Sequence, residues 1–236
     1  MRSTWRRELL LSLALAAPAE AQTAGHWREA RERLVAEELV PQGISDSLTL
    51  AAMRAVPRHE FVPEDQRPWA YADTPLPIGQ NQTISQPAVV AFMTQVIRPR
   101  PGLRVLEVGT GSGYQAAVLA ETGASVWTIE IFRALADEAR RRLMRLGYGG
   151  VQVRHGDGYA GWPEVAPFDA IVVTAGSDSI PPPLVRQLAP GGRLVMPVGS
   201  PWADQRLVLL EKDSSGRVAS RDLLPVRFVP LLRGER

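Results

Sequence analysis

The sequence predicts an α/β fold: a central, mostly parallel sheet with helices on both faces and a C-terminal antiparallel hairpin. Three observations favour it. From residue 86 onward, short apolar strand-like runs alternate with helical periods, which is typical of a parallel sheet covered on both sides. Two apolar runs near the C-terminus flank the turn sequence at 213–216, which predicts the hairpin. The length of 236 residues, 45% of them hydrophobic, allows one sizeable core.

The elements follow in chain order. Apolar residues at helical spacing predict helices over 27–40 and 46–54, the second capped by Ser45 or Asp46. The segment 63–86 carries Pro, Gly and Asn without a period, so an ordered but irregular connection is expected there. The later helices are expected at 87–97, 114–121, 132–146 and 183–188, and the strands at 103–108, 125–129, 151–154, 168–174, 193–197, 207–211 and 217–224.

Three parts are expected along the chain: an N-terminal extension at 1–24, a helical region with a covering loop at 25–86, and the main α/β domain with its hairpin and tail at 87–236. Several arginines precede an apolar run at 9–17, and the small residues at 19–21 resemble a cleavage site. This layout is typical of a secretory signal peptide. The alternative is an amphipathic or disordered extension of a cytoplasmic protein. No later stretch is long and apolar enough to span a bilayer.

Composition excludes several kinds of site. The chain has no cysteine, which excludes disulfides, thiolate zinc sites and cysteine nucleophiles. His26, His59 and His155 lack metal-ligand spacing, so no metal is expected. The net charge is only +2, and the densest basic run, at 140–145, lies in a helical pattern typical of a solvated face. A nucleic-acid-binding surface is therefore not expected.

A glycine-rich turn at 107–113 follows the strand expected at 103–108 and precedes a helix. Gly109 and Gly111 permit a tight turn and the close approach of a ligand. The spacing differs from the G-x-G-x-x-G pattern of dinucleotide sites, and Glu107 stands where it would repel a pyrophosphate. The turn therefore favours a ligand that carries an ammonium and a sulfonium, and disfavours a dehydrogenase. The alternative is an ordinary tight turn with surface acids nearby.

Two further acids follow the next strands. Glu130 ends the second strand, about 20 residues beyond the first glycines, where an acid accepts ribose hydroxyls in this kind of fold. Asp157, followed by Gly158, comes after the third strand and is expected to contact an adenine amino group. Because the carboxyl ends of parallel strands share one edge of the sheet, these acids predict a nucleoside with a cationic tail. S-adenosylmethionine has this chemistry.

The segment at 75–87 is the second group of interest. Ser85 is expected to cap the helix that begins with Pro87. Thr83 and Ser85 are also expected to project their hydroxyls over the methyl group of the cofactor.

Residues 56–232 resemble the protein-L-isoaspartate (D-aspartate) O-methyltransferase family. The glycine-rich turn is shared by many methyltransferases, whereas 83–87 and 227–231 are far more specific to this family. The motifs that carry the resemblance are 56–63, 77–87, 106–113, 156–158, 167–171, 190–194 and 227–231.

The resemblance implies a Rossmann-like methyltransferase fold that binds S-adenosylmethionine and needs no metal. It implies methylation of the free carboxyl of L-isoaspartyl and D-aspartyl residues in damaged proteins, which initiates their repair. Ser85 matches the active-site serine of the family, and the segment 226–231 would border the peptide groove. The residues that match cofactor contacts are Thr83, Ile84, Glu107, Glu130, Asp157 and Gly158, beside the glycines Gly109 and Gly111.

Two other functions stay open: a methyltransferase of the same fold with another acceptor, and a non-catalytic cofactor-binding or interaction module. The segment 83–87 argues against the first, and the intact Thr83 and Ser85 argue against the second. The expected partners are isoaspartyl-containing proteins and peptides, with no stable membrane association, and the chain is expected to be a monomer. The resemblance implies the cytoplasm, whereas the signal-like segment 1–21 implies the periplasm or export.

Overall fold

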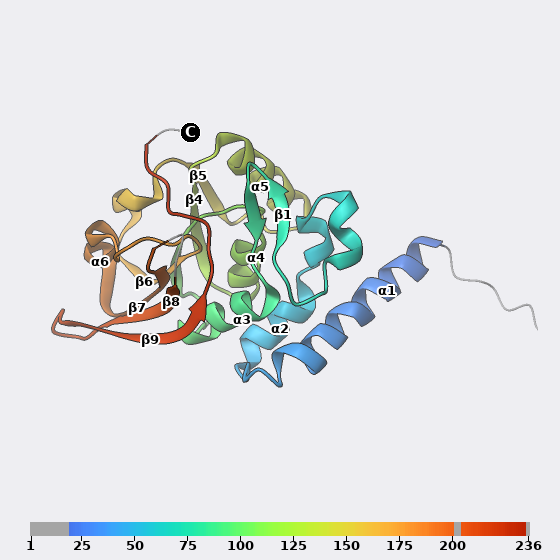
Figure 1. Ribbon diagram of the computed structural model, residues 1–236, viewed down its shortest axis with the longest axis horizontal. Coiled ribbons are helices and arrows are strands. Elements are labelled where there is room, and N and C mark those ends of the chain that lie inside the picture. The colour runs from blue at the N-terminus through green and yellow to red at the C-terminus, as the bar shows by residue number, and fades with distance from the viewer. Residues whose placement is uncertain (1–18, 201–203, 235–236) are drawn as a thin grey trace, which may run out of the picture.

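A computed structural model of the chain describes residues 19–200 and 204–234. Its centre is a seven-stranded sheet in the order β5-β4-β3-β6-β7-β8-β9 (Figure 1). The strands from β5 to β7 are parallel, and β8 and β9 add to the edge in antiparallel fashion, as the sequence predicts. The strands are β3 Arg104–Val108, β4 Ser125–Glu130, β5 Gln152–His155, β6 Phe168–Val173, β7 Leu188–Val198, β8 Gln205–Lys212 and β9 Val218–Val226.

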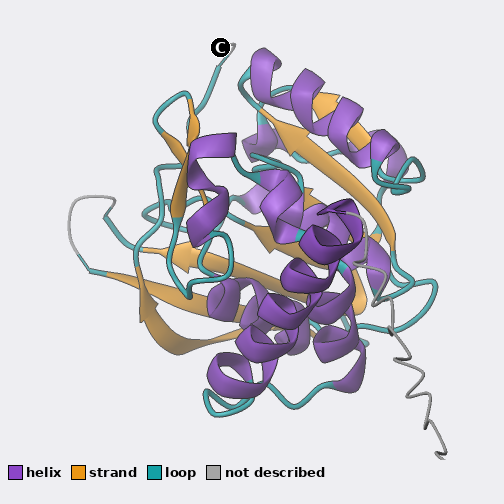
Figure 2. Cartoon of the chain, turned by 90° about the vertical axis from the view of Figure 1, so that its right-hand side faces the viewer, coloured by secondary structure: helices purple, strands orange, loops and turns teal. Residues whose placement is uncertain are grey.

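Helices cover both faces of this sheet. Alternate strand residues point to opposite sides: Val105 and Val172 belong to one buried cluster with α2, α3 and α4, whereas Leu106 and Val173 belong to a second cluster with α6. Figure 2 shows the helices of the N-terminal half gathered in front of the strands. The helices are α1 Ala19–Arg33, α2 Ser47–Ala55, α3 Pro87–Val96, α4 Tyr114–Glu121, α5 Arg133–Arg145 and α6 Pro182–Gln187, with a π-helix η1 Leu34–Leu39 and the 3-10 turns η2 Arg58–Phe61, η3 Glu64–Trp69, η4 Gly158–Ala160 and η5 Pro163–Val165.

The N-terminal helices differ in detail from the prediction. The first helix begins at Ala19 and passes directly into η1, so the expected boundary at 24/25 lies within a helix, and the division into three parts stays a prediction. Most of the signal-like segment 1–21 lies outside the described residues. Asp46 caps α2 as expected, since its side chain accepts a hydrogen bond from Thr49 N at 2.7 Å. None of the helices in 19–200 and 204–234 has the length and apolar character needed to cross a bilayer.

The segment expected to be irregular contains a small antiparallel sheet, which corrects that prediction. Strands β1 Leu76–Gly79 and β2 Gln82–Ile84 pair with each other. The two residues between them, Gln80 and Asn81, have φ of 52° and 55°, the conformation that a two-residue turn between twisted strands requires. This β1–β2 hairpin lies above the glycine-rich turn, with Ile78 near Gly111.

A smaller correction concerns α6 and the strand that follows. The helix ends at Gln187, and β7 begins at Leu188 and continues through Gly191 and Gly192, which the sequence placed at the end of the helix.

Candidate active site

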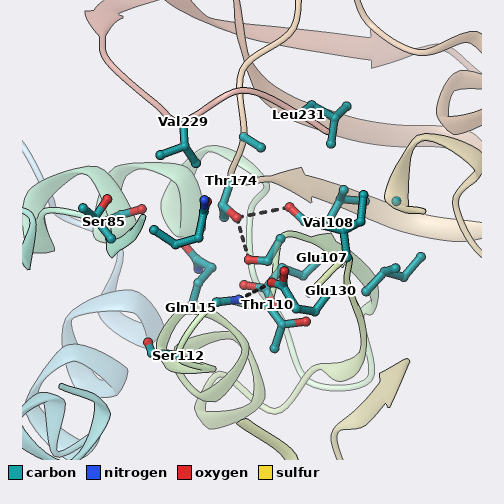
Figure 3. A pocket seen from close by; sticks show the side chains of 18 of the residues that line it. Ser85, Glu107, Val108, Thr110, Ser112, Gln115, Glu130, Thr174, Val229 and Leu231 are labelled. Carbon is teal, nitrogen blue, oxygen red and sulfur yellow. Dashed lines mark hydrogen bonds between the residues drawn. The ribbon is translucent and has the colours of Figure 1, made fainter. Parts of the chain in front are cut away.

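A pocket lies at the carboxyl ends of β3, β4 and β6. The chain leaves β3 toward β4 and β5 and then returns to β6 on the other side of β3, so the pocket is at the topological switch point, where open α/β sheets bind ligands. Its lining residues come from β2, the glycine-rich turn, the ends of β4 and β6, and the C-terminal tail (Figure 3). They are Gln82–Ser85, Val90, Glu107–Ser112, Tyr114, Gln115, Ile129–Phe132, Gly158, Thr174, Ala175 and Val229–Leu232.

Gly109 is confined by its neighbour across the sheet. Its φ is +99°, and a Cβ there would lie 2.3 Å from Thr174 Oγ1. That hydroxyl is held in place, because it donates to Gly109 O at 2.7 Å. Only glycine therefore fits at this position without strain, and the turn keeps open the space that a ligand would need.

Glu107 is completely buried at the base of the pocket. One carboxyl oxygen accepts a hydrogen bond from Thr128 Oγ1, and the other, Oε1, has no hydrogen-bond partner among the described residues. Burial raises the pKa of Glu107 to about 8, so the carboxyl is mostly neutral at pH 7 unless a cation lies beside it. The sequence predicts that Glu107 repels a phosphate, but this repulsion requires the ionised carboxylate, which burial disfavours. A cationic donor would both favour that ionisation and satisfy Oε1.

Glu130 is held at the end of β4 by backbone donors. One oxygen accepts from Gly111 N at 2.7 Å and the other from Phe132 N at 3.0 Å. The side chain is only 4% exposed, and burial raises its pKa, while the hydrogen bonds from Phe132 and Gly111 oppose the rise. Each oxygen keeps a free acceptor site, so the carboxylate can still accept the hydroxyls of a ribose.

Asp157 differs from the other two acids. One of its oxygens accepts from Tyr159 N at 2.9 Å and the other from Gly234 N at 3.1 Å. The pocket is lined by the next residue, Gly158, and not by Asp157. The structure therefore brings Gly158 to the pocket and uses Asp157 to hold the C-terminal tail; the expected adenine contact stays a prediction.

Ser85 does not cap α3, which corrects the sequence prediction. The helix begins at Pro87, so Gln86 is at the N-cap position, and the Gln86 side chain accepts no capping hydrogen bond from the helix. Instead, Asp73 Oδ1 accepts from Ala88 N at 2.8 Å, and Asp73 Oδ2 accepts from Gln86 Nε2 at 2.8 Å. Within the described chain the Ser85 hydroxyl makes no hydrogen bond, so it is free for a ligand.

A second, larger cavity, here called the groove, adjoins the pocket. It has a volume of about 790 Å³. Four of its residues, Thr83, Ser85, Thr174 and Val229, also line the pocket and form a shared wall. Figure 3 shows Ser85 on one side of the pocket, opposite Glu107 and Glu130, with Val229 and Leu231 above. The remaining groove residues are Pro75, Gln86, Val89, Asp204–Arg206 and Pro225–Phe228.

The C-terminal tail closes one side of both cavities. Gly176 N donates to Val229 O at 2.8 Å, and Leu231 N donates to Gly176 O at 2.7 Å. Arg233 lies over the Tyr159 ring, 4.0 Å from its centroid. Sequence reasoning placed this tail beside the groove only, and it missed Gln115 and Thr174 altogether. Thr174 ends the apolar run of β6, which is the one signal that could have pointed to it.

The residues present fit S-adenosylmethionine. The orphaned Glu107 Oε1 suits an ammonium, Glu130 suits a ribose, and Gly109 leaves room for the ligand against the backbone. Within 19–200 and 204–234, no group of three or more metal-ligating side chains is present. The fold and the pocket together define the class: a Rossmann-like methyltransferase that depends on S-adenosylmethionine.

Comparison with known proteins gives the family. The sequence profile of protein-L-isoaspartate(D-aspartate) O-methyltransferase matches residues 29–236. The protein-L-isoaspartate O-methyltransferase of Opitutus terrae is 54% identical over 97% of this chain and 97% of its own length. The protein-L-isoaspartate O-methyltransferase 2 of a Polaromonas species is 60% identical over 79% of this chain and 88% of its own. The chain belongs to the protein-L-isoaspartate(D-aspartate) O-methyltransferase family.

A solved structure agrees with this assignment. It is a Plasmodium falciparum protein assigned to the same family, in complex with S-adenosyl-L-homocysteine. It is 27% identical, with a TM-score of 0.76, and the match covers 86% of this chain and 99% of that one.

Proposed function

We propose that this chain transfers a methyl group from S-adenosylmethionine to the free carboxyl of L-isoaspartyl and D-aspartyl residues in damaged proteins, the step that initiates their repair. The observation that carries the proposal is the shared wall. Thr83 and Ser85 line both the narrow pocket, which suits a nucleoside with a cationic tail, and the larger groove, which has room for a peptide. Membership of the family supports the same reaction.

The acceptor explains why the site contains a hydroxyl and not a strong base. A carboxylate is ionised at pH 7 and needs no deprotonation. The cofactor supplies an electrophilic methyl group on its sulfonium. Ser85 donates its free hydroxyl to one carboxylate oxygen, and Thr83 contributes a second hydroxyl. A hydrogen bond to a charged acceptor contributes about 1.5–3 kcal/mol, and a neutral donor weakens the nucleophile less than an arginine would.

The chain's main contribution is alignment. Holding two reactants in line can supply on the order of 7–11 kcal/mol. On the cofactor side, Glu107 would take the ammonium and Glu130 the ribose, with Gly109 and Gly111 against the backbone side of the ligand. The other proposed cofactor contacts are Thr83, Ile84, Asp157 and Gly158.

A paired assay tests the reaction. The chain is given S-adenosylmethionine and two peptides that differ only in an isoaspartyl or a normal aspartyl linkage. Methyl transfer to the isoaspartyl peptide alone is expected. Equal methylation of both would favour a methyltransferase with another acceptor, and cofactor binding without transfer to either would favour a non-catalytic module.

We propose further that the enzyme works as a monomer in the cytoplasm, where S-adenosylmethionine is made, without stable membrane association. Fractionated cells and N-terminal sequencing test the compartment: a periplasmic protein with a mature start near Gln22 would overturn it. Light scattering on the purified chain tests the oligomeric state.

A further inference from the structure

Gln115 is a buried amide at the edge of the pocket. It lies in the first turn of α4, directly after Tyr114, and is 6% exposed. Both residues line the pocket, and Figure 3 shows Gln115 below the shared wall, on the side of Ser112 and Thr110. The sequence singled out no role for it.

The orientation of this amide follows from a chain of hydrogen bonds. Thr94 Oγ1 donates its only proton to Val90 O at 2.8 Å. The same oxygen can then only accept, and it accepts from Gln115 Nε2 at 2.9 Å. The nitrogen side of the amide is therefore committed to α3, and the oxygen, Oε1, must face the other way.

That oxygen, Gln115 Oε1, is buried without a hydrogen bond among the described residues, and so is Glu107 Oε1. A buried acceptor left unpaired destabilises a protein, because its hydrogen bonds to water are lost and not replaced. Here two such acceptors line one pocket, and a ligand with several N–H donors would satisfy both. A primary ammonium has three donors and no acceptor.

The orientation of S-adenosylmethionine in the pocket determines which of its N–H groups lies near Gln115. Glu130 would take the ribose. Phe132 follows β4 and Gly158 follows β5, and both line the pocket, where the adenine would extend. The sulfonium must lie toward Ser85. The methionine part of the cofactor would then occupy the other end of the pocket, beside the start of α4.

We infer that Gln115 is a positioning residue whose Oε1 accepts a hydrogen bond from the α-ammonium of the cofactor, with Glu107 supplying the opposite charge. The inference rests on the proposed function, since it takes the ligand to be S-adenosylmethionine. Thr94 fixes the amide, Gln115 gives the ammonium its direction, and the sulfonium is thereby turned toward the shared wall.

Calorimetric titration tests the inference without turnover. The two probes are S-adenosyl-L-homocysteine and its analogue in which hydrogen replaces the amino group. For Gln115→Met, which keeps the length of the side chain and removes the acceptor, affinity for S-adenosyl-L-homocysteine is expected to fall about tenfold. Affinity for the analogue is expected to change less than about twofold.

Gln95→Leu is the matched control. Gln95 is a glutamine near the end of α3 that does not line the pocket: its Oε1 accepts from Ser45 N and Asp46 N, and its Nε2 donates to Gly43 O. Its substitution should leave both affinities unchanged. Equal loss of both probes in Gln115→Met, or no loss of either, would overturn the inference. Failure of the unsubstituted chain to bind S-adenosyl-L-homocysteine would instead overturn the proposed function.

Discussion

The pocket and the groove share a wall but are built in different ways. The pocket is formed where strands end, and its acids are buried: Glu107 is 0% and Glu130 4% exposed. The groove is formed by the ends of β8 and β9 and by the tail, and its charged residues Asp204, Arg206 and Arg227 are exposed. Buried groups interact strongly because little water screens them, whereas exposed charges contribute little. The cofactor half should therefore tolerate far less change than the peptide half.

The largest effect is expected at Gly109. A Cβ there meets both a positive φ, which costs about 1–3 kcal/mol, and the Thr174 hydroxyl at 2.3 Å. Gly109→Ala should lower Tm by several degrees and weaken S-adenosyl-L-homocysteine binding more than about a hundredfold, because the turn must move. Gly147→Ala is the control, since Gly147 has φ of +89° and open space around it. It should lower Tm with no change in binding; equal binding loss in both variants would contradict the argument.

On the shared wall, Ser85→Ala should lower kcat about 10- to 100-fold, the loss of one hydrogen bond to a charged acceptor. Affinity for S-adenosyl-L-homocysteine should stay within about twofold, because the hydroxyl faces the acceptor. Steady-state kinetics with isoaspartyl peptide and a binding titration measure the two quantities. Full turnover in the variant would remove Ser85 from the mechanism.

At the base of the pocket, proton release should accompany binding. The pKa of Glu107 is about 8 in the folded chain, above its ordinary 4.5, so folding takes up a proton and the ligand-free protein loses stability as pH rises from about 4.5 to 8. A bound ammonium lowers the pKa of Glu107 again, so the carboxyl releases its proton. Titrations at pH 7 in two buffers of different ionisation enthalpy should show this release.

The matched variant for that measurement is Glu107→Gln, which has the same shape and does not titrate. It should bind about tenfold more weakly, release no proton from this position, and melt at a temperature less dependent on pH. Identical proton release in the variant would mean that another group titrates.

The smallest effect is expected in the groove. Arg227 is exposed there and makes no hydrogen bond or ion pair within the described residues. Arg227→Ala should change KM less than about threefold, and only for peptides with acidic residues near the acceptor, with the difference vanishing at high salt. A larger, salt-independent change would show that the groove binds as specifically as the pocket.

The contrast between the pocket and the groove also explains which parts of the site could be predicted from the sequence. Glu107 and Glu130 lie near the ends of short apolar runs that are typical of buried strands. Because the carboxyl ends of parallel strands share one edge of the sheet, the two acids could be predicted to lie together. The β1–β2 hairpin has strands of four and three residues with Pro and Gly in one of them, too short for any period to show.

Contacts between distant residues account for the remaining misses. Ser85 has a good capping residue type, but Asp73, far back along the chain, takes the role. Gln115 resembles any polar residue on a helix until Thr94 fixes its amide. The tail residues at 229–232 have no helical or strand period, and their pairing with Gly176 brings them to the pocket as well as to the groove.

The shared wall also determines how the enzyme could be redesigned. Thr83, Ser85, Thr174 and Val229 line both cavities, so a bulkier side chain at any of them would reduce the space for donor and acceptor together. A mutant library aimed at a new methyl acceptor should leave these four unchanged and vary the groove-only positions, Asp204, Arg206 and 225–228.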